Sequence, residues 1–417
     1  MPNRLFLYLT QQQMIAFHWE RGRCTLAKEF SIESAATDFV AYLRTHNKNL
    51  VSLVTNLAEE GFQLDTIPYL QSKDRAAVIK RKLEQFFIRA PLTVAISLGH
   101  EKTTRRNERM LFAALNNATA LDPWLNAFRI AETRLVGIYS LPLLSPVLLE
   151  KLQIVNERCI FISLQDNSIR QTFFDKGSLN FSRLAPVADS SVSGLAQSVG
   201  SEIKKLQQYL LSQRLIGRNE TLSAHVLIHS DALHALKNIV LPESIRLQTH
   251  PIEALAKKLG LKTEQQDSRA HVLFLQIAAQ QTPRQQFAPI ELRREYLLWK
   301  SSQVILTVSG IVLLICLLFA SKQWSNLQEQ QKRTLQQEMT AIEAENNYKK
   351  IVNTFPKLPV SQENLRQIIN RYNEIQKNSP LPEQIRGIAS NSFVRNSASG
   401  KLASKIIWQA LARVAAA

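Results

Sequence analysis

Glycine and cysteine are both scarce in this chain of 417 residues, which has 12 glycines and three cysteines. Phosphate-binding loops need glycines because their backbone N–H groups must approach the phosphate oxygens closely. No GxGxxG or Walker spacing occurs, and the cysteines form no C-x-x-C pair. The sequence therefore predicts no disulfide framework, no zinc site, no other metal site and no cofactor.

Charge is absent from the segment Ser301–Ser321, which Lys300 and Lys322 flank. Roughly 20 apolar residues in a helix span the ~30 Å hydrocarbon core of a bilayer. Trp299 and Trp324 bracket the segment, where amphipathic rings favour the headgroup level. A buried core helix is the alternative, but few such helices stay uncharged for so long. We expect a single transmembrane helix over 301–321.

The first thirty residues contain no apolar run suited to a signal peptide, because charged residues interrupt them. We therefore expect the N-terminus to be cytoplasmic, whereas the basic residues on the two sides of the span differ too little to decide. The predicted organisation is a cytoplasmic domain (1–286), a juxtamembrane linker (287–300), the span, a helical stalk (322–352) and a periplasmic segment (353–417).

The net charge of +17 admits either a nucleic acid or an acidic lipid surface as a partner. No helix-turn-helix signature, arginine-rich tract or interleaving of aromatic and basic residues is present. Attraction to the headgroups of the lipid bilayer is the simpler interpretation, and no nucleic-acid partner is expected.

Short β-rich runs alternate with helical patterns through the first 290 residues, which predicts an α/β fold. The first pass has expected strands at 4–9, 14–19, 24–30 and 51–56. A second pass repeats the theme with expected strands at 158–164, 169–174, 179–184 and 225–229, a tight turn at 175–177 and a helix at 192–213. Such duplicated α/β subdomains are characteristic of actin-like folds. Between the passes we expect a helix at 74–87, a strand at 92–98 and a long helix containing Met110, Leu111, Ala114 and Leu115.

An actin-like ATPase would carry an acidic, glycine-containing turn after the first strand of each half. The corresponding turns here contain Thr10, Gln11 and Gln12 in the first half and Gln165, Asp166 and Asn167 in the second. Neither contains glycine, and only one offers a carboxylate for magnesium, which is more simply an ordinary turn residue. We interpret them as degenerate phosphate loops.

A group of polar residues at 225–234 includes His225, His229 and His234. In the expected strand the first two lie about 13 Å apart at ~3.3 Å per residue. They are therefore not expected to converge on one metal ion.

Beyond the span, Leu335, Met339, Ile342 and Asn346 follow a heptad-like spacing that predicts a helical stalk rather than a full coiled coil. A second helix is expected over 362–377. The run 405–408 has the pattern of a strand, which cannot stand alone in water, so the periplasmic segment is expected to be incomplete.

In this layout the chain resembles the bitopic assembly-platform proteins of type IV pilus and type II secretion machines (GspL-type proteins and PilM–PilN pairs). Residues 51–56 with 59–62 resemble the early strand and loop of that family, and residues 173–183 resemble the hairpin after the second phosphate loop of PilM. Residues 287–294 stand where PilN has its Asn-Leu-Leu-Pro segment, with Pro289 matched, and residues 406–408 resemble the lead-in to the periplasmic domain of PilN.

This resemblance implies a non-enzymatic, single-pass scaffold in the bacterial inner membrane. Its partners would be a secretion or pilus assembly ATPase and a PilO-like or GspM-like inner-membrane protein, and a homodimer is possible. It implies a partner-docking segment containing Phe287, Pro289, Arg293 and Arg294. The alternatives are an actin-like ATPase with drifted nucleotide loops and a single-span signal-relay protein.

Overall fold

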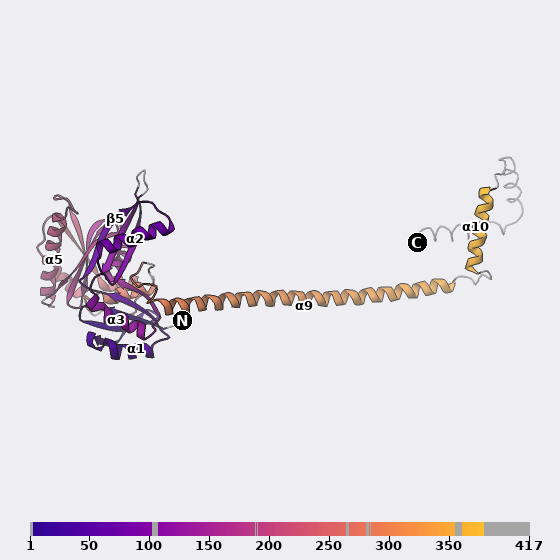
Figure 1. Cartoon of the computed structure of the whole chain (residues 1–417), viewed down its shortest axis with the longest axis horizontal. Helices are drawn as coiled ribbons and strands as arrows, with labels where there is room; N and C mark the ends of the chain where they lie inside the picture. Colours follow the sequence, from indigo (N-terminus) through magenta and orange to yellow (C-terminus); the bar gives the residue numbers. More distant parts are fainter. Residues whose placement is uncertain are drawn as a thin grey trace. The chain divides into compact units, whose positions relative to one another are not determined.

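The computed structural model describes residues 3–101, 107–187, 189, 191–263, 267–280, 283, 285–354 and 361–378. The chain divides after Val312 into two compact units. The first contains three β-sheets, and its residues up to Leu292 are called the α/β body below (Figure 1). The described residues of the second unit are helical, apart from Ser361.

The first five-stranded sheet has the order β3-β2-β1-β4-β8. Its strands are β1 (Arg4–Leu9), β2 (Gln13–Glu20), β3 (Arg23–Ser31), β4 (Leu50–Thr55) and β8 (Leu135–Ser140). Strands β1, β2 and β3 pair antiparallel, whereas β4 and β8 run parallel to β1. Leu5 and Leu7 pack into one apolar cluster and Phe6 and Tyr8 into another, as expected when alternate residues point to opposite faces. The unbroken apolar run of β1 therefore reflects burial on both faces.

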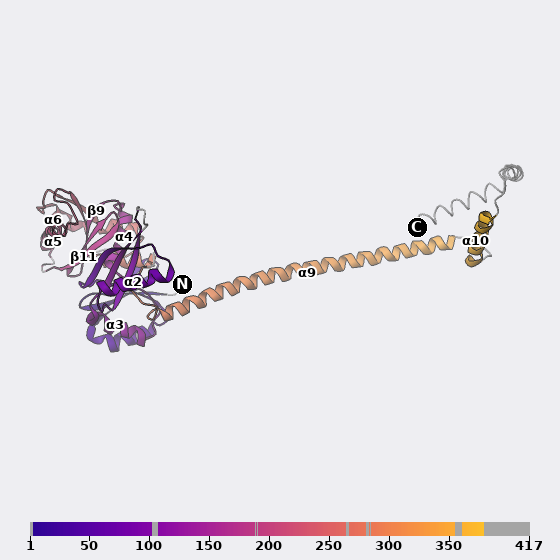
Figure 2. The ribbon, with the colours of Figure 1, turned by 45° about the horizontal axis from the view of Figure 1, so that its top comes forward.

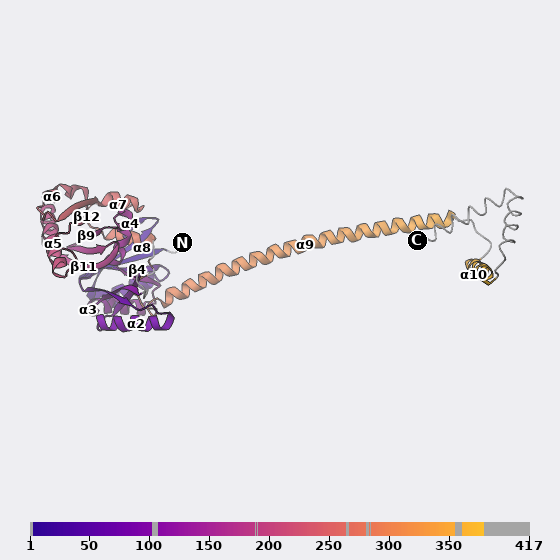
Figure 3. The same ribbon diagram turned by 90° about the horizontal axis from the view of Figure 1, so that it is seen from above.

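The second five-stranded sheet repeats this order as β11-β10-β9-β12-β13. Its strands are β9 (Arg158–Gln165), β10 (Ser168–Asp175), β11 (Ser178–Pro186), β12 (Leu222–Ile228) and β13 (Ile245–Pro251). The pairing senses also repeat, antiparallel within β9–β11 and parallel through β12 and β13. The predicted duplication is confirmed. Helix α5 (Val192–Ser212) covers one face of this sheet through Val199, Ile203 and Leu206 (Figure 3).

A third sheet, of order β5-β7-β6, is inserted within the first half. It contains β5 (Glu60–Ile67), β6 (Leu92–His100) and β7 (Glu108–Leu115), and helix α2 (Ser72–Phe86) packs on one face. The long helix expected around Met110 is wrong, because these residues form the central strand β7. An apolar run buried on both faces lacks the period-2 signal of a strand, so its sequence reads equally well as a helix.

Further helices complete the body: α1 (Val40–Thr45), α3 (Ala118–Ile130), α4 (Leu141–Leu152), α6 (Leu233–Lys237), α7 (Ile252–Lys258) and α8 (His271–Gln280). Helix α4 begins in a proline-rich stretch, and Pro142 is tolerated in its first turn because the N–H groups there have no partner within the helix. One apolar cluster combines Phe6 of the first half with Phe161 and Phe274 of the second. The two halves therefore share a core.

Helix α9 (Arg294–Thr354) is continuous through the juxtamembrane residues, the apolar segment and the stalk, as Figure 2 shows. Among the described residues it is the helix long and apolar enough to cross a membrane, and none of its most apolar window is buried. The predicted boundaries at 300, 321 and 352 stay predictions, since the helix passes through all three without a break. Helix α10 (Gln362–Asn378) confirms the expected second helix, whereas the expected strand at 405–408 lies outside the described residues.

The turn between β10 and β11 provides a test of the second half. Gly177 has φ +75°, and a Cβ there would lie 2.7 Å from Cγ1 of Val155. Gly177→Ala should therefore lower the free energy of unfolding by about 2 kcal/mol or more, through backbone strain and the clash together. The matched control is Gly99→Ala, which has φ +93° but no atom within 4 Å of the new Cβ, and should cost about 1 kcal/mol. Equal urea midpoints for the two variants would contradict this account.

Candidate functional site

The two turns predicted to be degenerate phosphate loops lie side by side. One joins β1 to β2 and the other joins β9 to β10, so each follows the first strand of its half. Together they line a cavity of about 390 Å³. Its described lining is Thr10, Gln11, Gln12, Gln13, Asn56, Ala58, Asp166, Asn167, Ser168, Leu184, Pro186 and Val187. The sequence reasoning thus found turns that the fold brings together.

The first turn has little capacity for an anion. The hydroxyl of Thr10 accepts hydrogen bonds from the backbone N–H groups of Gln12 (3.3 Å) and Gln13 (3.1 Å). The backbone N–H of Thr10 donates to the carbonyl oxygen of Gln13. A phosphate loop works by directing such N–H groups at the ligand. Here the chain itself satisfies them.

The second turn has its carboxylate engaged. Asp166 lies 3.3 Å from the guanidinium of Arg269, which also binds Asp267 at 2.6 Å. No lysine or arginine is present in the described lining of the 390 Å³ cavity. A neighbouring cavity of about 400 Å³ shares Asp166 and Val187 and includes Arg269. Amide side chains dominate the first cavity, so it offers neutral hydrogen bonds rather than positive charge to a ligand.

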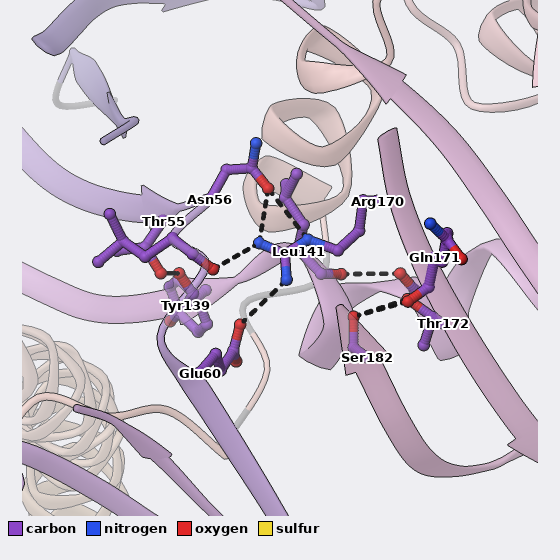
Figure 4. Close-up of polar contacts among 11 residues, drawn as sticks. Thr55, Asn56, Glu60, Tyr139, Leu141, Arg170, Gln171, Thr172 and Ser182 are labelled. Carbon is purple, nitrogen blue, oxygen red and sulfur yellow. Dashed lines mark hydrogen bonds and ion pairs between the residues drawn. The ribbon is translucent and has the colours of Figure 1, made fainter. Parts of the chain in front are cut away.

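Arg170 connects the two halves through Asn56, which lines this cavity (Figure 4). It lies on β10, is 1 % exposed, and donates to the side-chain oxygen of Asn56 at 2.8 and 3.1 Å and to the carbonyl oxygen of Leu57 at 2.7 Å. Both acceptors follow β4 of the first half. The hydrogen bonds therefore fix the position of one half against the other.

Glu60, at the start of β5, is the carboxylate facing this guanidinium, with 4.0 Å between its Oε2 and Nη1 of Arg170 (Figure 4). Burial raises the pKa of Glu60 to about 7, although Arg170 and Ser140 act in the opposite direction. Burial also lowers the pKa of Arg170. A buried carboxyl with a pKa near neutrality makes this contact sensitive to pH.

Tyr8 provides a second connection between the halves. Its hydroxyl donates to Oε1 of Gln165 at 3.2 Å, and its ring stacks on His271 with centroids 5.2 Å apart. Burial raises the pKa of Tyr8 and lowers that of His271, so both are neutral near pH 7. Gln165 therefore serves in the contact between the halves, and it lines the neighbouring 400 Å³ cavity rather than the first one.

The histidines at 225–234 do not converge. His225 is fully buried and bonds to His250 of β13 at 2.9 Å between ring nitrogens, whereas His229 lies 3.0 Å from Glu253. Burial lowers the pKa of His250 to about 4. Among the described residues no group of three or more histidine, cysteine or acidic side chains is placed to hold a metal ion.

The predicted docking segment packs on its own chain. Phe287 is 2 % exposed and belongs to the same apolar cluster as Trp124 and Phe128 of α3. Its backbone N–H donates to the carbonyl of Ile138, and the side chain of Gln286 accepts from the N–H of Ile138. The segment is thereby hydrogen-bonded to β8, the outer strand of the first sheet.

The other docking candidates differ in exposure. Pro289 and Arg294 are exposed, and Arg293 is half-buried with its guanidinium 5.6 Å from the ring of Tyr296. Docking of a partner on these residues stays a prediction, but the side chain of Phe287 is already held in the core.

Sequence reasoning missed Arg170, Glu60 and Arg269, which determine the electrostatics of the site. An arginine within the apolar strand 169–174 was the available signal, because an unpaired buried charge is too costly to occur without partners. The partners themselves lie more than a hundred residues away and leave no local pattern.

No protein-family model matches the sequence, and no curated protein does either. Among solved structures, the chain is similar to the PilM-PilN type IV pilus biogenesis complex, with 11 % identity and a TM-score of 0.42 over 66 % of this chain and 97 % of that one. The cytoplasmic domain of EpsL, an inner-membrane component of the type II secretion system of Vibrio cholerae, gives 12 % identity and a TM-score of 0.32 over 63 % and 96 %. A Bacteroides thetaiotaomicron protein with an actin-like ATPase fold and unknown function gives 11 % and 0.33 over 61 % and 95 %.

The fold is actin-like, because the two halves repeat the same strand order and the same pairing senses. The resemblance to pilus and type II secretion platform proteins that the sequence suggested recurs among these structures.

Glu60→Gln should remove a pH-dependent part of the stability. The folded pKa of about 7 lies above the ordinary value of 4.5, so between these values the folded state binds a proton that the unfolded state has lost. The contribution is fully present below the ordinary pKa and is lost as pH rises through about 7. Between pH 5 and pH 8 the free energy of unfolding of the wild type should fall by roughly 2–3 kcal/mol more than that of the variant.

Urea unfolding of the full chain in detergent, followed by tryptophan fluorescence at pH 5, 6, 7 and 8, measures this difference. The matched control is Glu59→Gln, because Glu59 is the exposed neighbour. A wild-type pH profile parallel to that of Glu60→Gln would refute the assignment.

Proposed function

We propose that this protein is a non-enzymatic, single-pass scaffold of a type IV pilus or type II secretion assembly platform in the bacterial inner membrane. The α/β body is cytoplasmic and binds the assembly ATPase. The helix after the span binds a PilO-like or GspM-like protein in the periplasm. One helix joins the two ends, so movement at the ATPase reaches the periplasmic partners.

The observation that carries this proposal is the attachment of α9 to the body. Phe287 and Leu292 are buried in the core of the first half, and α9 begins two residues after Leu292. The helix then continues through the uncharged segment to Thr354 without a break. A helix held in this way moves with the body, whereas a helix on a flexible linker would not.

The state of the two turns supports a scaffold over an enzyme. The backbone N–H groups of Gln12 and Gln13 are satisfied by Thr10, and Asp166 is paired with Arg269. Magnesium-bound nucleotide would need both a free carboxylate and free donors. The alternative, an actin-like ATPase with drifted loops, requires both sets of contacts to open on binding.

Calorimetry distinguishes these two functions. The full chain in detergent micelles, titrated with magnesium–ATP, should show no affinity better than about millimolar. The full chain keeps Phe287 and Leu292, which belong to the core of the body. Micromolar binding would support the ATPase alternative.

Interrupting the attachment tests the scaffold itself. Four glycine and serine residues inserted between Arg294 and Glu295 leave Phe287 docked and the span intact, but they free the helix from the body. In a deletion strain this variant should reach the membrane at normal abundance and fail to restore pili or secretion.

The matched control is the same insertion between Gly217 and Arg218, in an exposed turn of the second half, which should restore assembly. Normal assembly by the first variant would contradict mechanical coupling. A deletion that alters transcription, with pili and secretion intact, would instead favour the signal-relay alternative.

A further inference from the structure

The first sheet has one edge at which positive charge gathers. Strands β1, β4 and β8 run parallel, so their amino-terminal ends lie together. The turn between β2 and β3 lies at the same edge, because Arg4 pairs with Trp19 in the antiparallel register. Residues far apart in sequence therefore meet along this edge, which is called the amino edge below.

The amino edge is rich in cations. Arg21 and Arg23 are exposed in the β2–β3 turn, Lys48 is exposed before β4, and Arg134 precedes β8 with its guanidinium 3.3 Å from the carbonyl of Lys48. Lys262 joins them, since its backbone N–H donates to the carbonyl of Gly22 at 2.8 Å. None of these five forms an ion pair with a carboxylate in the described part of the chain.

The beginning of α9 lies against this edge and adds further charge. Tyr296 lines a small cavity together with Arg4, Leu50 and Val136. The juxtamembrane cations are Arg293, Arg294 and Lys300, and the carboxylates of the edge and this segment are Glu20, Glu132, Glu291 and Glu295. The cations, with Arg4, outnumber these carboxylates.

The helix fixes the distance from the amino edge to a bilayer. Tyr296 shares a cavity with residues of the edge, and the uncharged segment begins at Ser301, five residues later, which is about 7.5 Å of helix. Headgroups extend ~5–7 Å beyond the hydrocarbon on each side of a membrane. The edge therefore lies within about one Debye length, ~8 Å at physiological salt, of the lipid phosphates.

We infer that the amino edge binds the headgroups of anionic lipids, with Arg21 and Arg23 of the β2–β3 turn as its exposed contacts. This inference rests on the membrane span proposed above and adds a lipid contact to it. The lipid phosphates supply negative charge to cations that have no carboxylate partner among the described residues. The amino edge lies at one end of the first sheet. Lipid bound there holds this end of the body against the membrane and limits the tilt of the body relative to the bilayer.

Trypsin cleaves after lysine and arginine, so it can detect whether lipid covers Arg21 and Arg23. The full chain is reconstituted in nanodiscs of phosphatidylcholine alone or with about one third phosphatidylglycerol. Cleavage after Arg21 and Arg23 should be about five-fold slower in the anionic discs. The difference should vanish in 0.5 M salt (about a 4 Å Debye length), since screening removes surface attraction. Cleavage after the exposed Lys204 of α5, which covers the second sheet rather than the first, should be the same in both discs.

A pair of charge-reversal variants separates lipid contact from general charge. Arg21→Glu with Arg23→Glu should abolish the effect of anionic lipid on cleavage after Lys48. Lys204→Glu with Lys237→Glu makes the same change in net charge on exposed residues of α5 and α6 and should preserve it. Thermal unfolding of each variant verifies that the body is folded.

Three outcomes would overturn the inference. Equal cleavage in the two kinds of nanodisc shows that no lipid contact exists. Equal protection by free inorganic phosphate in neutral discs shows a small-anion site instead. Loss of protection in the α5–α6 variant shows that total charge alone is responsible. Extraction by carbonate would overturn the span and hence the proposed function, so the two failures are distinguishable.

Discussion

A guanidinium group shielded from water lies where the two halves of the α/β body meet, and the geometry of the site depends on it. Arg170 reaches from β10 to Asn56 and Leu57, which follow β4. Asn56 itself lines the cavity and is hydrogen-bonded to Leu9, just before the first turn, and Arg170 follows the second turn by three residues. Any rotation of one half against the other would break three hydrogen bonds to a buried charge, which is costly because water cannot replace them.

The contact between Arg170 and Glu60 contributes more to the specificity of the fold than to its stability. The oxygens of Glu60 and Nη1 of Arg170 have no hydrogen-bond partner among the described atoms, so their desolvation is only partly offset. An apolar pair of similar volume would stabilise the body at least as well. It would not select one relative position of the halves, since apolar contacts are not directional. A fixed body suits a scaffold better than a nucleotide-driven clamp.

The sequence predicted the repeated parts of the fold best. The β-rich runs and the turn residues located the hairpins of both halves. In the second half the turn at Lys176 and Gly177 needs positive φ, which glycine adopts readily. In the inserted sheet the strand β6 was predicted but the central strand β7 was missed, since β7 is buried on both faces and its residues Met110–Leu115 carry no alternation. The two turns of the site were found from their position after the first strand of each half. The charges that control them were not, because Arg269 and Glu60 meet their partners only in three dimensions.

The buried ring of Phe287 has a practical consequence. It fills a space beside Trp124 and Phe128, so a soluble version of the body that ended at Gln286 would leave an apolar hole on its surface. Truncating a buried phenylalanine to alanine alone costs about 3–5 kcal/mol, a large share of the stability of most domains. Such a shortened protein would aggregate or bind detergent at the hole, and a hydrophobic peptide captured there would imitate a natural partner.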